Sequence, residues 1–232
     1  KIANDLYRNS HQIPAPSIMA VDDNEANLKL ITVLLEDMGI TVVPVDSGPQ
    51  ALIELELHDI DMIFMDIQMP GMNGLEATQL IRQKQSAKEL PIIALTAHAI
   101  ADEKDKILKI GMNDYQTKPI NNDQLMQCIE RWTGYHCELD KTKPPHLLAT
   151  NSEASDSTEV SDCLIFDALS AMRLANQKLD LAIDMQAMLL ENLTEDLQDI
   201  ETLWHNQQQA ELLQRVHKIH GATRYCGTPC LM

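Results

Sequence analysis

The chain has 232 residues, of which 35 are acidic and 18 are basic, and its formal net charge is −17. This excess of negative charge repels nucleic acid phosphates and anionic lipid headgroups, so we expect no nucleic acid and no membrane among the partners of this chain. No run of about 18 apolar residues is present, and the five cysteines lack CxxC spacing, which favours reduced thiols in a cytoplasmic location.

Residues 1–16 are polar, contain Pro14 and Pro16, and are predicted to be a linker from an upstream domain. Strand-like and helix-like segments then alternate five times. The predicted strands are 17–21, 41–45, 62–65, 91–95 and 114–117, and the predicted helices are 25–38, 49–58, 75–84, 100–110 and 122–132. Such alternation predicts a parallel α/β sheet with helices on both faces. Because Pro44 lacks an N–H donor, the second strand is expected at an edge, which favours the doubly wound, flavodoxin-like order 2-1-3-4-5.

The third predicted strand is the centre of the sequence. Met62 to Met65 is a short apolar run typical of a strand buried on both faces, and Asp66 follows it directly. The pairs Pro70-Gly71 and Asn73-Gly74 predict a tight loop after it. Taken alone, Asp66 is equally well explained as a helix cap or a loop residue. Other side chains at neighbouring strand ends decide between these interpretations.

Five polar groups converge if the sheet has the expected order. Asp22 and Asp23 end the first strand, Asp66 the third, Thr96 the fourth and Lys118 the fifth. Carboxylates this close repel one another unless a cation lies among them, and hard oxygen ligands favour Mg²⁺. With an ammonium and a hydroxyl beside it, the metal forms a cage for a phosphoryl group. The sequence therefore predicts that Asp66 is a nucleophile that becomes an aspartyl-phosphate.

Four motifs carry a resemblance to the receiver domain of two-component signalling, over about residues 17–134. They are Val21-Asp22-Asp23-Asn24, the run from Met65 to Gly74, Ala94-Leu95-Thr96-Ala97-His98, and Lys118-Pro119. The resemblance implies a CheY-like fold in which Asp23, Asp66 and the main-chain carbonyl of Gln68 bind Mg²⁺, with Asp22 assisting. It also implies that Thr96 and Lys118 bind the phosphoryl oxygens. Tyr115 matches the family's aromatic switch position, although an ordinary half-buried strand tyrosine is the alternative.

The remainder of the chain changes character. Residues 135–163 are rich in Ser, Thr, Lys and Pro with few large apolar groups, and are predicted to be a flexible linker. Residues 164–232 show no strand pattern. Helices are predicted at 167–175, 179–206 and 208–226, with Leu197, Leu213 and Val216 among the inward-facing residues. Thr228-Pro229 predicts the start of a fourth helix, so we expect a four-helix bundle cut short at its C-terminal end.

The motif His217-Lys218-Ile219-His220-Gly221 resembles the phosphorylation motif His-x-Leu-Lys-Gly of histidine-phosphotransfer (HPt) domains. Gly221 inside a helix costs about 1 kcal/mol relative to Ala, which indicates that something approaches the backbone there. The resemblance implies that His217 is the phosphorylated residue. His220 stands where the family has lysine, so a permanent positive charge beside the phosphate is missing.

A receiver followed by an HPt domain resembles the C-terminal part of tripartite hybrid sensor histidine kinases, most closely the GacS/BarA type. The resemblance implies a phosphorelay in which an upstream kinase histidine passes a phosphoryl group to Asp66. Asp66 passes it to His217, and His217 passes it to a separate response regulator. The expected parent is a transferase anchored in the inner membrane, whose ATP-binding kinase core is not in this sequence.

Three alternatives stay open at this stage. The first is a stand-alone phosphorelay adaptor without a kinase core. The second is a transition-metal site built from His217, His220, Cys226 and Cys230. The third is an interaction module with an inactive receiver, against which the complete acidic triad argues. An incomplete bundle also leaves apolar surface uncovered, so we expect self-association or a poorly ordered helical region.

Overall fold

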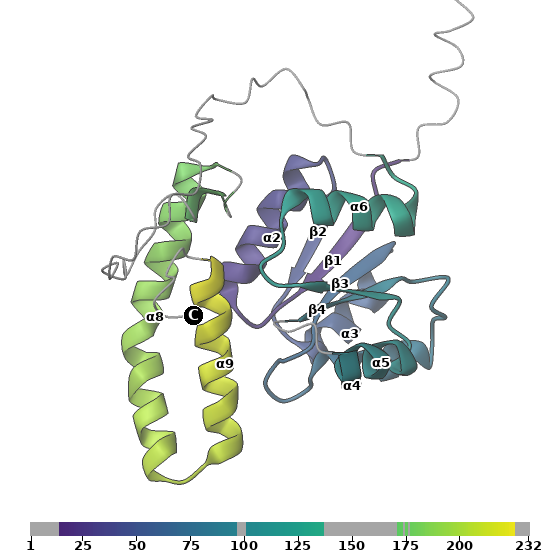
Figure 1. Ribbon diagram of the computed structural model, residues 1–232. Helices are drawn as coiled ribbons and strands as arrows, with labels where there is room; N and C mark the ends of the chain where they lie inside the picture. Colours follow the sequence, from purple (N-terminus) through teal and green to yellow (C-terminus); the bar gives the residue numbers. More distant parts are fainter. Residues whose placement is uncertain (1–13, 97–100, 137–170, 174, 176, 226–232) are drawn as a thin grey trace, which may run out of the picture.

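The computed structural model describes residues 14–96, 101–136, 171–173, 175 and 177–225. Five parallel strands form one sheet: β1 (Ser17–Val21), β2 (Thr41–Val45), β3 (Met62–Asp66), β4 (Ile92–Thr96) and β5 (Asp114–Thr117). Their order is β2-β1-β3-β4-β5, which confirms the predicted topology (Figure 1). Pro44 lies on the edge strand β2, opposite Ala20 of β1. The missing N–H of Pro44 is tolerated there because one side of an edge strand has no neighbour.

Helices cover both faces of this sheet. They are α2 (Glu25–Asp37), α3 (Gly48–Leu57), α4 (Gly74–Arg82), α5 (Ala101–Ile110) and α6 (Asn122–Thr133). Alternate residues of β1 point to opposite faces, so Ile18 packs with residues of α2 and α6 whereas Met19 packs with residues of α3, α4 and α5. Burial on both faces explains why β1, β3 and β4 are continuous apolar runs.

The predicted element boundaries differ from the observed ones by at most two residues. Asp66 and Thr96 are the last residues of β3 and β4 rather than the first residues after them. Both therefore retain strand pairing, with Asp66 opposite Leu95 and Thr96 opposite Thr117. The pairing holds these side chains at the carboxyl edge of the sheet. Each is also buried, with an exposed fraction of 4% for Asp66 and 7% for Thr96.

Two further helices, α8 (Leu179–His205) and α9 (Gln209–Tyr225), form an antiparallel hairpin, which we call the helical hairpin. Arg215 of α9 forms ion pairs with Asp196 and Asp199 of α8 and so fixes the pairing of the two helices. The predicted helix at 167–175 and the fourth helix at Thr228 fall largely or wholly outside the described residues.

The predicted inward face of the helical hairpin is partly wrong. Leu197, Leu213 and Val216 are exposed, by 55%, 69% and 45%. The prediction placed this stripe inside an incomplete helical bundle. In the described residues, α8 and α9 instead pack against each other, and one face of the pair packs against the α/β domain. Helical spacing identifies a stripe of apolar residues, but the stripe becomes buried only where a neighbouring element covers it.

Candidate functional site at the carboxyl edge of the sheet

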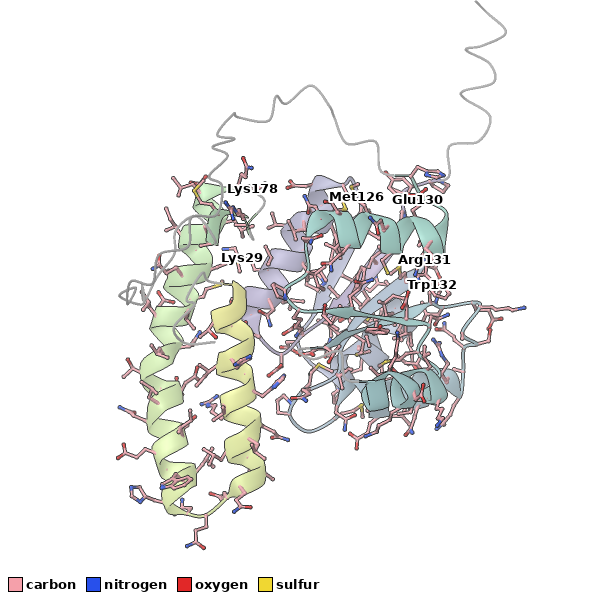
Figure 2. The ribbon with its side chains drawn as sticks, in the orientation of Figure 1. Lys29, Met126, Glu130, Arg131, Trp132 and Lys178 are labelled. Atoms are coloured by element: carbon pink, nitrogen blue, oxygen red, sulfur yellow. The ribbon has the colours of Figure 1, made fainter. Side chains whose placement is uncertain are left out.

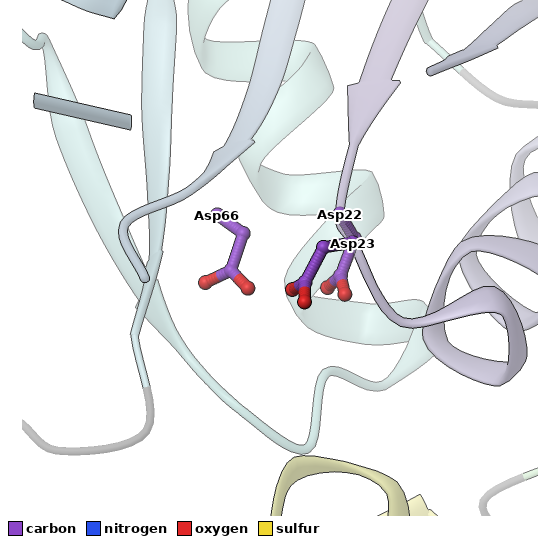
Figure 3. A group of neighbouring side chains, drawn as sticks. All are labelled: Asp22, Asp23 and Asp66. Atoms are coloured by element: carbon purple, nitrogen blue, oxygen red, sulfur yellow. The ribbon is translucent and has the colours of Figure 1, made fainter. Parts of the chain in front are cut away.

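Three carboxylates meet where β1 and β3 end. Asp22, Asp23 and Asp66 each place an oxygen within 4.8 Å of the other two (Figure 3). Asp22 and Asp66 are buried and Asp23 is partly exposed. Parallel strands bring these residues together because their carboxyl ends share one edge of the sheet. Among the described residues, this is the group of acidic, histidine or cysteine side chains with the geometry to hold a metal ion.

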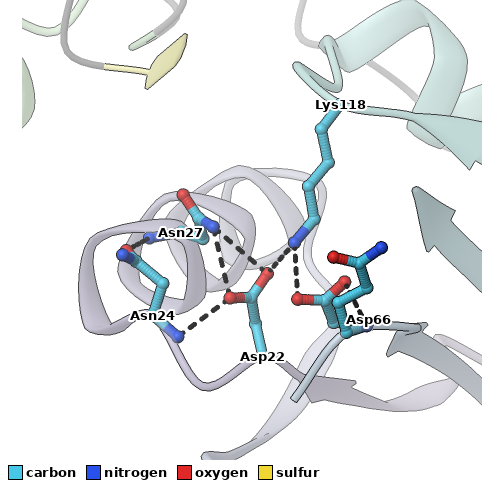
Figure 4. Close-up of polar contacts among 6 residues, drawn as sticks. Asp22, Asn24, Asn27, Asp66 and Lys118 are labelled. Atoms are coloured by element: carbon cyan, nitrogen blue, oxygen red, sulfur yellow. Dashed lines mark hydrogen bonds and ion pairs between the residues drawn. The ribbon is translucent and has the colours of Figure 1, made fainter. Parts of the chain in front are cut away.

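Lys118 lies between two of these carboxylates. Its Nζ is 2.6 Å from Oδ2 of Asp22 and 2.9 Å from Oδ2 of Asp66, and its side chain is almost completely buried (Figure 4). A cis peptide bond joins Lys118 to Pro119, and the Lys118 N–H donates to the carbonyl oxygen of Thr96. The main chain thus ties the end of β5 to the end of β4, and Thr96 and Lys118 share the edge that holds Asp66.

Asp22 is held by two asparagines: Asn24, the N-cap of α2, which one of the sequence motifs includes, and Asn27 of α2, which the sequence analysis did not single out. Its Oδ1 accepts hydrogen bonds from the Asn24 N–H at 3.0 Å and from Asn27 Nδ2 at 3.2 Å (Figure 4). Asn24 also caps α2 by accepting from the Asn27 N–H. The signal for Asn27 was a polar residue one turn into α2, on the face that the apolar pattern assigns to the core. A buried amide there needs a partner, and Asp22 supplies it.

Burial and mutual repulsion change the acidity of the cluster. Loss of solvent raises the pKa of Asp23 from 3.8 to about 6, with the Asp22 charge as the next contribution. Lys218 of α9 and Lys118 act in the opposite direction on the pKa of Asp23. Burial also raises the pKa of Asp66, while the neighbouring Lys118 ammonium lowers it. The cluster therefore gains from any additional cation that reaches it.

The loop after β3 is shaped by one glycine. A Cβ on Gly74 would lie 2.0 Å from the main-chain oxygen of Asp66, so no other residue fits there without moving the backbone. Asn73 caps α4 through a capping box with Glu76. Gln68 is exposed in this loop, and its N–H lies 3.4 Å from Oδ1 of Asp66. The loop thus returns to the end of β3 and brings the Gln68 backbone beside Asp66.

Tyr115 of β5 is half-buried and packs against the cluster of apolar residues that lies under α3, α4 and α5. The Lys104 ammonium lies over its ring, 4.7 Å from the centroid. Both the switch role and the alternative of a structural tyrosine are compatible with this position. Ala97 and His98 lie outside the described residues.

His217 lies at the mouth of the acidic site. It lines a cavity of about 260 Å³ together with Asp23, Gln68, Pro70 and Lys218, which means that α9 faces the β3–α4 loop. His220 is one turn further along α9 and is partly buried. Cys226 and Cys230 lie outside the described residues, so the alternative metal site stays untested.

Comparison with known proteins agrees with this arrangement. Residues 18–130 match the response regulator receiver domain. The polar-differentiation response regulator DivK of Brucella ovis is 36% identical over 118 residues, which cover 51% of this chain and 96% of DivK. The chain belongs to the response regulator receiver family. A solved receiver domain of a sensor histidine kinase from Pseudomonas aeruginosa, with magnesium coordinated in its active site cleft, is 37% identical, and the match covers 52% of this chain and 98% of that chain with a TM-score of 0.48.

The receiver is followed by a second recognised domain, because residues 184–231 match the Hpt domain. Two hybrid-kinase relatives align with nearly the whole chain. The sensor histidine kinase GacS of Pseudomonas protegens is 46% identical over 221 residues, 94% of this chain and 23% of GacS. The histidine-protein kinase BarA of Escherichia coli K12 is 40% identical over 217 residues, 93% of this chain and 22% of BarA. The chain spans about a quarter of the length of these relatives and combines the receiver and Hpt domains found in them.

Proposed function

We propose that this chain is a phosphorelay segment in which the receiver accepts a phosphoryl group on Asp66 and passes it to His217. The observation that carries the proposal is that His217 lines a cavity together with Asp23 and Gln68. Asp23 also belongs to the carboxylate cluster with Asp66, and Lys118 is ion-paired to Asp66, which supports a common site for the nucleophile, the ammonium and the acceptor imidazole. Positioning of this kind supplies most of the catalysis in phosphoryl transfer.

Both transfers are substitutions at phosphorus. In the first, an Asp66 oxygen attacks the phosphorus of a phosphohistidine, a P–O bond forms, the P–N bond breaks, and the departing imidazole takes a proton from solvent. In the second, a ring nitrogen of neutral His217 attacks the aspartyl-phosphate. A P–N bond forms, the P–O bond breaks, the Asp66 carboxylate is regenerated, and the His217 ring releases a proton. Lys118 and Thr96 stabilise the negative charge that is spread over the phosphoryl oxygens during each transfer.

The donor set fits Mg²⁺. Asp23 and Asp66 supply hard carboxylate oxygens, and Asp22 completes the three-carboxylate cluster. Carboxylates within 4.8 Å of one another repel unless a cation lies among them. The main-chain carbonyl of Gln68 is the proposed fourth protein ligand, since the loop brings this backbone beside Asp66. When bound, Mg²⁺ would neutralise charge on the phosphoryl oxygens. Tyr115 is proposed to turn inward when Thr96 binds them.

The proposed partners are an upstream histidine kinase core as donor and a response regulator as final acceptor. The kinase names of GacS and BarA support the donor and a longer parent with transferase activity. The response regulator as acceptor and the anchoring of that parent in the inner membrane are proposed from the resemblance to hybrid histidine kinases alone. Within the described residues, no helix is long and apolar enough to cross a membrane. The proposed domain limits are 1–16 for the upstream linker, 17–134 for the receiver, 135–163 for the second linker and 164–232 for an incomplete HPt domain.

Radiolabelled phosphate chased from the receiver to the helical hairpin tests the relay. Asp66→Asn is expected to abolish labelling of the chain by the kinase core. His217→Gln should leave label on Asp66 and end its transfer, whereas His220→Gln should only slow the transfer. A His217 variant that still transfers, beside an inactive His220 variant, would reverse the assignment of the acceptor.

Self-association is the second part of the proposal. The helical hairpin exposes large apolar side chains, namely Leu190, Leu197, Trp204 and Leu213. Exposed apolar patches of this kind usually contact a partner. We expect the average mass in light scattering to rise with protein concentration, and Leu213→Gln together with Leu197→Gln to reduce that rise. A monomer at every concentration would contradict the expectation.

A further inference from the structure

The helical hairpin lies against one helix of the receiver, α2. Residues of both domains share one apolar cluster, in which Ile31 and Leu35 of α2 lie with Leu181 and Met185 of α8 and Ala222 of α9. Figure 1 shows α8 and α9 beside α2, on the side of the receiver where β1 ends. The contact is therefore apolar at its centre and extends along α2 toward the acidic site.

Two ion pairs flank this apolar contact and fix its direction. Lys29 Nζ lies 2.7 Å from Oδ2 of Asp184, and Lys178 Nζ lies 2.6 Å from Oδ1 of Asp37. Figure 2 labels the two lysines of these pairs. Lys29 and Asp37 are eight positions apart on α2, about 12 Å along its axis. Their partners occur in the reverse order along α8. The two helices therefore run antiparallel in a single register, and sliding by one turn would break both pairs.

This register determines which part of the helical hairpin lies next to the acidic site. The N-terminal end of α2 follows Asp22 and Asp23 directly, so α8 runs toward the carboxylates as it leaves Lys178. α8 and α9 then line a cavity of about 580 Å³ with Asp22 and Asp23, to which Asn192, Arg215 and Lys218 contribute. Arg215, held by Asp196, is two residues before His217. The ion pairs on α2 thus position His217 indirectly, through the pairing of α9 with α8.

We propose that the α2 face, centred on Lys29 and Asp37, is the docking site for the helical hairpin of the same chain. Transfer from Asp66 to His217 then runs within one molecule. This inference rests on the proposed relay, and it adds the docking surface, its charged determinants and the identity of the partner. Lys29 is a positioning residue, since it contacts neither the phosphoryl group nor the acceptor.

A charge-exchange experiment on the full chain tests the docking surface. Asp66 is loaded with labelled acetyl phosphate, a small donor that needs no protein docking, and label on His217 is followed with time. Lys29→Glu or Asp184→Lys should slow this transfer about five- to tenfold, because each replaces an attraction with a repulsion. The double variant Lys29→Glu/Asp184→Lys should restore the rate. Loading of Asp66 should be unchanged in all three.

The matched control is Lys84→Glu. Lys84 forms a 2.6 Å ion pair with Glu56 on the receiver surface, away from α2, so its loss should leave transfer unchanged. Lys178→Glu with Asp37→Lys is an independent second exchange. Equal transfer rates in the wild type, Lys29→Glu and Asp184→Lys chains would overturn the docking surface. Chains in which Asp66 never becomes labelled, or in which Asp66→Asn leaves His217 labelled, would instead overturn the relay.

Mixing identifies the partner. Chains carrying Asp66→Asn are combined with chains carrying His217→Gln at micromolar concentration, so that transfer must cross between molecules. We expect label on the intact histidine to appear at least tenfold more slowly than in the wild type. Transfer at the wild-type rate in the mixture would show that the hairpin docks on a second copy, and would overturn docking within one chain.

Discussion

Lys118 is the residue on which the charge balance of the acidic site depends. Its ammonium contacts Asp22 and Asp66 at once, and all three groups are buried. Its single positive charge lies between these two carboxylates, and for Asp23 the opposing effects of Lys218 and Lys118 do not prevent a rise in pKa. Burial is the largest cause of that rise, to about 6, and the Asp22 charge adds to it.

The raised pKa of Asp23 predicts how the stability of the metal-free protein depends on pH. A carboxyl whose pKa is raised in the folded state binds protons more tightly there than in the unfolded chain, where its pKa is about 3.8. Stability should therefore fall as pH rises from about 4 through 6. In EDTA, we expect a lower Tm at pH 7.5 than at pH 5, with a smaller difference in Asp23→Asn.

The metal supplies the control for this pH experiment. Adding Mg²⁺ at pH 7.5 should raise the Tm of the wild type and have a much smaller effect on Asp23→Asn, because binding to the folded state alone stabilises it. If Asp23→Asn retained the whole difference in Tm between pH 5 and pH 7.5, the raised pKa of Asp23 would not be its cause.

At the scale of residues, the sequence predicted the charged members of the cluster better than the side chains that hydrogen-bond to them. Asp22, Asp23 and Asp66 follow apolar runs and Lys118 follows a short polar strand, and the geometry of a parallel sheet brings the carboxyl ends of such strands together. Asn27 was missed because its importance comes from a hydrogen bond to Asp22 across a helical turn. The apolar pattern of α2 marks a polar residue on its core-facing side but does not identify Asp22 as the partner.

The β3–α4 connection is the element whose shape depends most on a single residue. Gly74 opens α4 and lies against the Asp66 carbonyl, where a Cβ would come within 2.0 Å. Gly74→Ala must therefore move either the strand end or the loop that carries Gln68. We expect labelling of Asp66 by acetyl phosphate to fall at least about tenfold, since small displacements at a reacting centre are costly.

Gly71 in the same loop is a suitable control. Its φ is +72°, and nothing lies within 4 Å of the position where its Cβ would be. Asn adopts such a backbone more readily than most residues, so Gly71→Asn should leave labelling of Asp66 close to that of the wild type. Comparable losses in both variants would show that the loop tolerates no substitution and that the contact between Gly74 and Asp66 is not special.

Strands and helices differed in how well the sequence predicted them. The assignments of the central strands were accurate because burial on both faces leaves an apolar run, as in the first four residues of β3. The helical hairpin was predicted as helices with nearly correct bounds, but the exposure of Leu213 and Val216 was not. Which side of a helix is buried depends on its neighbours. The contact between α2 and α8 could not be predicted, because neither segment carries a local sequence pattern that indicates the other.

At the scale of the whole molecule, the net charge of −17 opposes docking of the helical hairpin on the receiver. Two acidic domains approach each other, and the lysines at the interface offset that repulsion locally. Lys29 and Lys178 face Asp184 and Asp37, while Lys218 of α9 lowers the pKa of Asp23. The interface thus places three of the basic side chains where the opposing surface is acidic.

The apolar cluster that runs from the sheet into the helical hairpin also joins docking to folding. Docking requires a folded receiver, so the free energy of docking adds to the free energy of unfolding of the receiver. Lys29→Glu should therefore lower the Tm of the receiver, although its side chain is partly exposed and lies outside the acidic site, whereas Lys84→Glu should have less effect. Calorimetry on chains that carry no phosphate would then measure how tightly the receiver and the helical hairpin associate. The thermal unfolding of the receiver would thus report on the docked arrangement from which the phosphoryl group is transferred.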